Sequence, residues 1–354
     1  MTIYQVVPSL NSYDNVIGNY VSFFDKKLKN AGMESEIFVI DINEKLQNNN
    51  CDYYRNHPNL KEDDIVIYHI CQKSSITEDV KIEKCKKIAI YHNTTPAHFF
   101  YQYFPELCQQ QYESVLDIQS LNNNFDWCIA DSEFNKQDLI RLGYNADKIS
   151  VIPLLFDFTS YKEQCDVNII NKYNDDYINI IFVGQIVPNK KQEDIIRAYA
   201  YYKKYINSKS RLILIGSPAG SKYIKILKEY VSELDLDDVV FTEKIFFTEL
   251  LSYYSIADIF LCMSEHEGFC IPMVEAMMFN IPIIAYDSTV IPYILNGSGI
   301  LVDEKNPVLI SKIIDRIVSN DNIKNEIINK QREQLETFNS ENVFNKLMEI
   351  IKKI

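Results

Sequence analysis

The sequence has little of what marks membrane, secreted or disordered proteins. Its 354 residues include only 9 glycines and 11 prolines, which leaves little room for long disordered linkers. No stretch approaches 18 consecutive apolar residues, and residues 1–8 lack a basic region followed by a long apolar one. We therefore expect a cytoplasmic protein without a membrane span or a secretory signal.

Two motif classes are missing as well. The eight cysteines form no CxxC pair and no ladder of metal-ligand spacing, so we interpret them as reduced and mostly buried thiols. Neither half of the chain has the G-x-G-x-x-G pattern that a Rossmann-type oxidoreductase needs after its first strand. These absences argue against a zinc site recognisable from spacing and against a dinucleotide-dependent oxidoreductase.

Positive charge is in deficit. The 36 basic and 49 acidic side chains give a net charge of −13, which repels nucleic-acid phosphates and anionic lipid headgroups at long range. We therefore expect no nucleic-acid partner. A bound nucleotide is compatible with this charge, because a few amides and one or two cations in a cleft act at distances where net charge is screened.

What the chain does contain is a regular alternation of strand and helix patterns. Its length exceeds what one hydrophobic core usually organises, which favours two domains. Such alternation predicts α/β domains with parallel sheets, helices on both faces, and ligands beyond the carboxyl ends of the strands. The expected strands are residues 3–7, 35–40, 64–68, 87–91, 127–130 and 149–152, then 178–184, 211–216, 239–241, 258–263, 281–285 and 300–302.

A polar stretch separates the two series of strands. Residues 159–176 show no clear periodicity, and we place the domain boundary there. The expected domains are residues 1–158, which bind the acceptor, and residues 159–338, which bind the donor. The chain from residue 308 onward has a helical pattern, and a last helix at residues 339–354 can pack back on the first domain.

One segment combines a strand end, a loop and a helix start. Within residues 264–277, SEHEGFCIPMVEAM, Gly268 permits close approach of the backbone to a ligand and Pro272 suits a first helical turn. The amides of such a turn favour a diphosphate. Glu267 and Glu275 have seven residues between them, so both can face one cleft and bind sugar or ribose hydroxyls. A helix-capping role for Glu275 is the alternative.

This segment resembles the E-x7-E signature of the retaining glycosyltransferases of family 4. The resemblance implies a GT-B fold, in which two Rossmann-like domains face each other across a cleft. It also implies that Glu267 is a catalytic residue beside the donor sugar and that Glu275 binds the ribose hydroxyls. The backbone of Gly268, Phe269 and Cys270 then holds the donor phosphates.

A second family motif is matched in part. In FVGQIVPNKKQED, residues 182–194, the expected strand ends at Gly184, and the family has Arg next and Lys five residues later. Here Gln185 replaces that Arg, while Lys190 matches the Lys that faces the leaving diphosphate in the family. The missing Arg leaves three alternatives: Lys191 compensates for the lost cation, the donor is unusual, or the activity is reduced. A solvated pair of lysines at a helix start is the alternative.

The first half offers three further candidates. His92 follows an expected strand and resembles the family's histidine that contacts the donor sugar, so we expect it to be catalytic. His69 follows another strand and is expected on the acceptor side. Asp14, in a loop at the place of the family's glycine-rich loop, is an expected acceptor contact. The alternatives are that both histidines are structural and that Asp14 caps a helix. The aromatic run at residues 98–104 fits a wall for a sugar or lipid acceptor, and core packing of a helix is the alternative there.

Together these resemblances imply a transferase. A sugar would pass from a nucleotide-sugar donor to a glycan or lipid-linked glycan acceptor, with retention, an α-linkage and no metal or other cofactor. Such catalysis depends on positioning and on charge stabilisation at the leaving phosphate. We expect a role in polysaccharide or glycolipid assembly, with peripheral membrane contact left open. A catalytically silent GT-B partner is the alternative, because Gln185 weakens the phosphate site.

Overall fold

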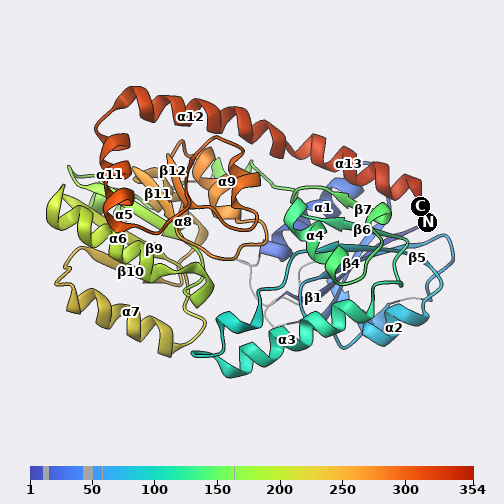
Figure 1. Ribbon diagram of the computed structural model, residues 1–354. Helices are drawn as coiled ribbons and strands as arrows, with labels where there is room; N and C mark the ends of the chain where they lie inside the picture. The colour runs from blue at the N-terminus through green and yellow to red at the C-terminus, as the bar shows by residue number, and fades with distance from the viewer. Residues whose placement is uncertain (11–15, 43–50, 58, 163) are drawn as a thin grey trace. The chain divides into compact units, whose positions relative to one another are not determined.

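The computed structural model describes residues 1–10, 16–42, 51–57, 59–162 and 164–354. The chain divides into two compact units, each built around its own parallel sheet (Figure 1). The first unit comprises Met1–His98, Glu106–Phe158 and Phe338–Ile354, and the second comprises Phe99–Pro105 and Thr159–Thr337. The predicted α/β class with two Rossmann-like parallel-sheet domains is confirmed.

The first unit contains a seven-stranded sheet in the order β3-β2-β1-β4-β5-β6-β7, with every neighbouring pair parallel. Its central strands are mostly apolar, and all six residues of β4 are buried. Strands covered on both faces have this character, because helices shield each side from water. The strands are β1 Ile3–Leu10, β2 Ser35–Ile42, β3 Cys51–Tyr53, β4 Ile65–Ile70, β5 Lys86–Tyr91, β6 Trp127–Ala130 and β7 Ile149–Val151.

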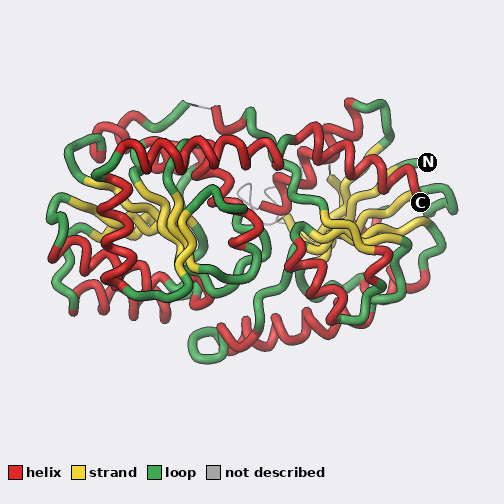
Figure 2. Tube along the Cα trace, turned by 45° about the horizontal axis from the view of Figure 1, so that its top comes forward, coloured by secondary structure: helices red, strands yellow, loops and turns green. Residues whose placement is uncertain are grey.

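Helices lie on both faces of this sheet, as the tube drawing shows (Figure 2). The last helix of the chain belongs here: Phe344 packs edge-on against Phe24 at 6.2 Å between ring centroids, and the Lys353 ammonium lies 3.6 Å from the centre of a Trp127 ring. Lys27 also pairs with Glu341. The helices are α1 Val16–Asn30, α2 Thr77–Ile82, α3 Pro105–Ser120, α4 Glu133–Arg141 and α13 Ser340–Lys353.

The second unit contains a six-stranded parallel sheet in the order β10-β9-β8-β11-β12-β13. The strands are β8 Ile178–Val183, β9 Ser210–Ile215, β10 Val239–Glu243, β11 Ile259–Cys262, β12 Ile283–Tyr286 and β13 Ile300–Val302. The helices are α5 Val167–Tyr173, α6 Gln192–Tyr205, α7 Ser221–Glu233, α8 Phe247–Ser255, α9 Ile271–Met278, α10 Ile291–Leu295, α11 Pro307–Val318 and α12 Asp321–Leu335.

Both strand orders contain a point where the direction of winding reverses. In the first unit this point lies between β1 and β4, and in the second between β8 and β11. Loops leaving the carboxyl ends of the two strands then diverge to opposite faces and leave room for a ligand. The fold therefore directs attention to the carboxyl ends of β1 and β4 in one unit and of β8 and β11 in the other.

Two segments differ from the sequence-based expectation. Residues 159–176 contain helix α5, whose N-cap is the Asp166 carboxylate accepting from the Asn168 amide, although no periodicity predicts a helix there. The Phe99–Pro105 segment groups with the second unit, because Tyr103 packs on Tyr223 at 5.1 Å and Lys222 donates to the Gln102 carbonyl. Tyr103 thus packs against α7.

Across the described residues, no helix combines the length and the apolar character needed to cross a membrane.

Candidate active site

The loops after β8 and β9 begin with two glycines in close contact. Gly184 has φ 154° and Gly216 has φ 144°, a region that side chains rarely adopt. A Cβ atom on Gly216 would lie 2.1 Å from the Gly184 carbonyl oxygen. Glycine at these positions therefore lets the two strand ends converge, and the chain after Gly184 turns toward the loop that follows β11.

A buried ion pair joins these loops. The Lys190 ammonium, at the end of the short 3-10 helix Pro188–Lys190, pairs with the Glu267 carboxylate after β11. The side chains are 20% and 7% exposed. Burial alone lowers the pKa of Lys190, but the Glu267 carboxylate together with Cys270 and Cys262 outweighs burial and holds the pKa above its ordinary value. Lys190 is therefore a fixed cation at the switch point of the second sheet.

Backbone and neighbouring side chains hold this pair in place. The Glu267 amide donates to the Thr289 hydroxyl at 3.1 Å, and the Asn189 side-chain amide donates to the His266 carbonyl at 3.0 Å. The Glu265 amide in turn donates to the Asn189 carbonyl at 2.8 Å. The loop after β11 is thus fixed to the 3-10 helix by two bonds and to Thr289, after β12, by a third. This gives the rigidity that a binding site requires.

Lys191 belongs to a second, more exposed network. Its ammonium lies 3.3 Å from the Glu265 carboxylate, and Lys305 lies 2.7 Å from the same carboxylate and 3.0 Å from Asp194. Burial alone raises the pKa of Glu265, but the two lysines hold it below its ordinary value. The neighbouring Gln185, at the family's Arg position, is exposed. Lys305 adds a cation near this edge that no sequence motif indicates.

Glu275 is held by two tyrosines. One carboxylate oxygen accepts from the Tyr161 hydroxyl at 2.6 Å and the other from the Tyr254 hydroxyl at 2.5 Å. Burial raises the pKa of Glu275, while both tyrosine hydrogen bonds act in the opposite direction. The carboxylate is thus fixed from α8 and from residues before β8, and each oxygen keeps a second lone pair that can accept a further hydroxyl.

The turn before α9 has an unusual backbone. Cys270 is the N-cap residue with φ 62°, which costs energy for any residue except glycine. Gly268, Phe269 and Cys270 precede the helix, whose start carries partial positive charge. The Cys270 thiol reaches the Cys262 thiol at the end of β11: its hydrogen bond lowers the pKa of Cys262 and the pKa of Cys270 is raised.

In the first unit, the two candidate histidines form one hydrogen-bonded chain. His92 Nδ1 lies 2.8 Å from the Asp131 carboxylate, His92 Nε2 lies 2.9 Å from His69 Nδ1, and His69 Nε2 lies 3.3 Å from the Gln5 side-chain oxygen. We name these four residues the histidine relay. Both nitrogens of His92 are engaged within its own unit, so a contact with a donor sugar requires it to give up one of these bonds.

The relay holds three protons. Each of its three hydrogen bonds needs one proton, and the Gln5 oxygen supplies none because the amide nitrogen of Gln5 donates to the Val21 carbonyl. Two neutral imidazoles supply two, so the third lies between Asp131 and His92. Burial raises the pKa of Asp131 and lowers that of His69, in keeping with a protonated or ion-paired Asp131 end and a neutral His69.

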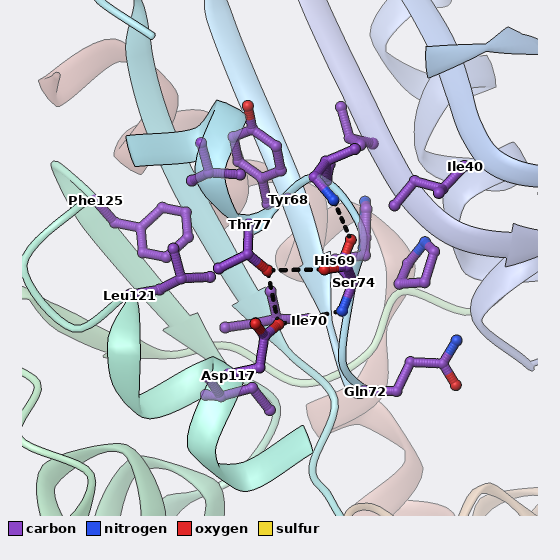
Figure 3. Close-up of a pocket in the computed structure, with 15 residues that line it drawn as sticks. Ile40, Tyr68, His69, Ile70, Gln72, Ser74, Thr77, Asp117, Leu121 and Phe125 are labelled. Carbon is purple, nitrogen blue, oxygen red and sulfur yellow. Dashed lines mark hydrogen bonds between the residues drawn. The ribbon is translucent and has the colours of Figure 1, made fainter. Parts of the chain in front are cut away.

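A small apolar pocket lies beside the relay (Figure 3). Its volume of about 20 Å³ has room for one water-sized group and not for a sugar ring. His69 lines it together with Ile70 and Phe125, while the Thr77 hydroxyl donates to the Asp117 carboxylate at its rim. In this form the pocket holds no acceptor sugar. Asp14, the other expected acceptor contact besides His69, lies outside the described residues.

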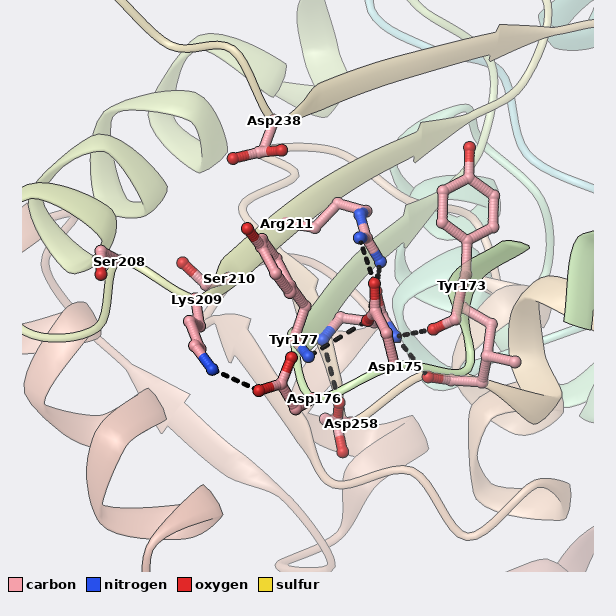
Figure 4. Close-up of polar contacts among 12 residues, drawn as sticks. Tyr173, Asp175, Asp176, Tyr177, Ser208, Lys209, Ser210, Arg211, Asp238 and Asp258 are labelled. Atoms are coloured by element: carbon pink, nitrogen blue, oxygen red, sulfur yellow. Dashed lines mark hydrogen bonds and ion pairs between the residues drawn. The ribbon is translucent and has the colours of Figure 1, made fainter. Parts of the chain in front are cut away.

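The amino edge of the second sheet carries charges too (Figure 4). The Arg211 guanidinium lies between the rings of Tyr173 and Tyr177, 4.9 and 4.8 Å from their centres. It donates to the Asp175 carboxylate and to the Asn179 side-chain oxygen, both at 2.9 Å. This edge lies opposite the one where ligands bind in parallel sheets, so we interpret the cluster as structural.

The second unit matches a known family. Residues 167–334 match the family model described as Glycosyl transferases group 1. The alpha-monoglucosyldiacylglycerol synthase of Acholeplasma laidlawii is 28% identical over 160 residues, 44% of this chain and 39% of that protein. The O-antigen chain mannosyltransferase RfbU of Salmonella typhimurium is 31% identical over 179 residues, 49% of this chain and 46% of that protein. The matches thus span less than half of either relative.

Solved structures match over the whole chain. Anabaena Alr3699/HepE in complex with UDP and glucose has a TM-score of 0.78 at 15% identity, with 100% of both chains covered. The sucrose-phosphate synthase of Thermosynechococcus elongatus has a TM-score of 0.75 at 16% identity, covering 100% of this chain and 99% of that one. These likenesses establish the GT-B fold. The similarity to group 1 glycosyltransferases in the family model thus concerns residues 167–334, within the second unit.

Proposed function

We propose that the protein is a retaining glycosyltransferase that moves a hexose from a nucleotide-sugar donor to a glycan or glycolipid acceptor. The observation that carries the proposal is the buried Lys190–Glu267 pair at the switch point of the second sheet, within the region that matches the family. Burial of two charges is costly, and a buried charge pair among loops at the carboxyl edge of a parallel sheet is a candidate for a functional site.

The donor would bind at the carboxyl edge of the second sheet. Lys190 would exchange part of its contact with Glu267 for a phosphate oxygen, and the start of α9 with Gly268, Phe269 and Cys270 would face the same diphosphate. Glu275, held open-sided by its two tyrosines, would accept from the ribose hydroxyls. Glu267 would then contact the sugar itself, next to the bond that breaks.

Catalysis would rest on charge at the leaving group. As the bond from the sugar to the diphosphate breaks, Lys190 and the helix start stabilise the charge on the departing phosphate without a metal ion. The acceptor hydroxyl would attack from the same face and pass its proton to the leaving phosphate. The two named relatives are a synthase of alpha-monoglucosyldiacylglycerol and a mannosyltransferase of an O-antigen chain, which supports a glycan or lipid-linked acceptor here.

A nucleotide-sugar panel tests the proposal. Purified full-length chain is mixed with UDP-, GDP- and ADP-sugars, and melting temperature and donor hydrolysis are measured for wild type, Lys190→Ala and the control Lys209→Ala on the amino edge. We expect one nucleotide class to stabilise wild type and Lys209→Ala, by about 2.7 kcal/mol at a concentration 100-fold above Kd. Lys190→Ala should lose most of this stabilisation.

Two outcomes would contradict the proposal. Equal stabilisation of Lys190→Ala and wild type would place the nucleotide elsewhere. Binding without turnover of any donor would favour the silent GT-B partner, an alternative that the exposed glutamine at position 185 supports because it removes a cation from the phosphate site. The anomeric configuration of the product, read by NMR, tests retention separately.

A further inference from the structure

The edge that carries Lys190 also brings two thiols and a carboxylate together. One sulfur each from Cys262 and Cys270 and one carboxylate oxygen of Glu267 lie within 4.8 Å of one another, and all three side chains are buried. Sulfur and carboxylate ligands are the set that Zn²⁺ and related soft divalent ions take in proteins. The two cysteines are eight residues apart and have no CxxC spacing, so the sequence pattern alone does not reveal the cluster.

The local backbone explains why these atoms converge. Cys262 is the last residue of β11, and Cys270 is the N-cap of α9 with φ 62°, a left-handed turn that brings the chain back toward the strand end. Glu267 lies between them in a loop held by the Thr289 hydroxyl. The conformational cost at Cys270 is thus associated with the placement of its sulfur next to Cys262.

The distances suit a small tetrahedral ion. Zn–S bonds of about 2.3 Å at the tetrahedral angle separate two sulfurs by about 3.8 Å, and Zn–O bonds are slightly shorter. Atoms already within 4.8 Å reach this geometry by small side-chain rotations. The Ser264 hydroxyl, 3.2 Å from the Cys262 sulfur, or a solvent molecule would complete the fourth position.

Charge also balances. Before binding, the Glu267 carboxylate and the Lys190 ammonium sum to zero, with both thiols neutral. Binding of a divalent ion releases two thiol protons, so two thiolates, one carboxylate, the metal and Lys190 again sum to zero. The ion therefore adds no net charge to a buried site, which avoids the large desolvation cost of an unbalanced charge.

We propose that Cys262, Glu267 and Cys270 form an inhibitory site for a soft divalent cation such as Zn²⁺. The metal binds Glu267 through the carboxylate that the donor sugar needs, so metal and donor exclude each other. The binding half of this inference stands on the cluster alone, whereas the inhibitory half rests on the proposed function of Glu267.

Metal binding is tested without reference to activity. Reduced, metal-free full-length chain is titrated with Cd²⁺, and the ultraviolet thiolate-to-metal absorption band and proton release are followed. We expect one ion and about two protons per chain. Cys262→Ser and Cys270→Ser should each weaken binding at least about tenfold, the scale of losing one ligand interaction of 1.4 kcal/mol. The matched control Cys108→Ser should bind as wild type.

Inhibition is tested next with Cys262→Ser, whose side chain has no assigned role in donor binding. Buffered free Zn²⁺ should abolish nucleotide stabilisation and donor hydrolysis in wild type, a chelator should restore both, and Cys262→Ser should resist. No thiolate band, or a band unchanged in both variants, overturns the metal site. A thiolate band together with nucleotide binding that Zn²⁺ does not change would overturn only the claim that metal and donor share the Glu267 carboxylate. If a variant does not fold, a labelling experiment on wild type replaces the variant test. Cys262 and Cys270 are alkylated with and without Zn²⁺, and the extent of labelling is read by mass spectrometry. Zn²⁺ should protect both thiols, and equal labelling with and without Zn²⁺ overturns the site.

Discussion

The two edges of the second sheet carry similar charges in different settings. At the amino edge, Arg211 pairs with Asp175, which is 39% exposed, and its guanidinium is covered by two aromatic rings. At the carboxyl edge, Lys190 and Glu267 are 20% and 7% exposed, and the neighbouring groups are thiols and backbone. An ion pair by itself therefore does not identify a site in this protein.

What separates the edges is how each charge is satisfied. The amino-edge cation has a carboxylate, an amide oxygen and two ring faces as partners within the fold. The Lys190 ammonium has three donors and faces Glu267, with no aromatic ring covering it in the contacts of the described residues. Both residues lie at the reversal of strand order where ligands bind in parallel sheets. The comparison predicts that mutations at one edge change function, and that mutations at the other change stability.

The largest expected effect is at Lys190. Lys190→Ala should reduce kcat/KM for donor hydrolysis or transfer by about 10²- to 10³-fold, because it removes a preorganised cation from the leaving phosphate. The melting temperature of the double variant Lys190→Ala/Glu267→Gln should fall little, because the group left buried at position 267 is then an uncharged amide. Steady-state kinetics and thermal melts of the single and double variants measure both.

A matched control is Lys191→Ala. Lys191 contacts the more exposed Glu265, and we expect a loss of less than about tenfold, which is less than 1.4 kcal/mol. If Lys191→Ala were as damaging as Lys190→Ala, Lys191 would supply the charge that the glutamine at position 185 lacks. If neither mattered, the functional interpretation of the carboxyl edge would be wrong.

The second effect concerns the tyrosines that hold Glu275. Tyr254→Phe removes one of two hydroxyl donors from a buried carboxylate and should cost about 1–3 kcal/mol of unfolding free energy. Nucleotide affinity should fall as well, because the carboxylate loses its orientation. Urea denaturation and nucleotide titration test this. Tyr201→Phe, at a half-buried position in α6, should change neither quantity, and an equal effect there would contradict a specific role for Tyr254.

The sequence predicts the sheets well because buried parallel strands are continuous apolar runs. The expected strand at 300–302 matches β13, and the runs at 178–184 and 211–216 match β8 and β9 to within one residue at each end. Strand β3 was not predicted, since Cys51–Tyr53 is too short to show a pattern. Helix α5 was missed because only Tyr173 is buried along it.

The candidate site was predictable where its residues share a short segment. Glu267 and Glu275 lie in one motif, and Lys190 is in register with a strand-end glycine. Thr289 and Lys305 come from other loops, and only the folded sheet brings them near. The histidine relay has the same limit: strand ends place His69, His92 and Asp131 at one edge, but the order of the hydrogen bonds depends on side-chain packing.

A third effect tests the relay in the other unit through pH. Near pH 8 the unfolded chain binds two protons at Asp131, His92 and His69, whereas the folded relay binds three, so the free energy of unfolding falls as pH rises. Near pH 5 the unfolded chain binds four protons at the same groups, so the free energy of unfolding falls as pH drops. The relay therefore contributes most near the ordinary histidine pKa of about 6.5. These signs agree with the raised pKa of Asp131 and the lowered pKa of His69.

Asp131→Asn isolates the third proton. An asparagine amide can donate to His92 Nδ1 without an extra proton, so the folded relay then binds two. The unfolding free energy of wild type minus that of the variant should decrease by up to about 1.4 kcal/mol per pH unit between pH 5 and 8. Urea denaturation across this range gives the slope. A flat difference would mean that the relay holds two protons and that the Gln5 amide is turned the other way.

The smallest expected effect returns to the amino edge. Arg211→Ala removes a cation that is stacked between two rings and bonded to Asp175 and Asn179, and we expect a loss of about 1–2 kcal/mol in unfolding free energy from lost stacking and hydrogen bonds. Arg211→Lys should recover part of it, because an ammonium keeps the charge but cannot reproduce the planar fork. Donor turnover and nucleotide affinity at a temperature where both variants are folded should equal those of wild type. A selective loss of activity in Arg211→Ala would mean that the two edges are coupled through β8 and β9, and the division between a structural and a functional edge would fail.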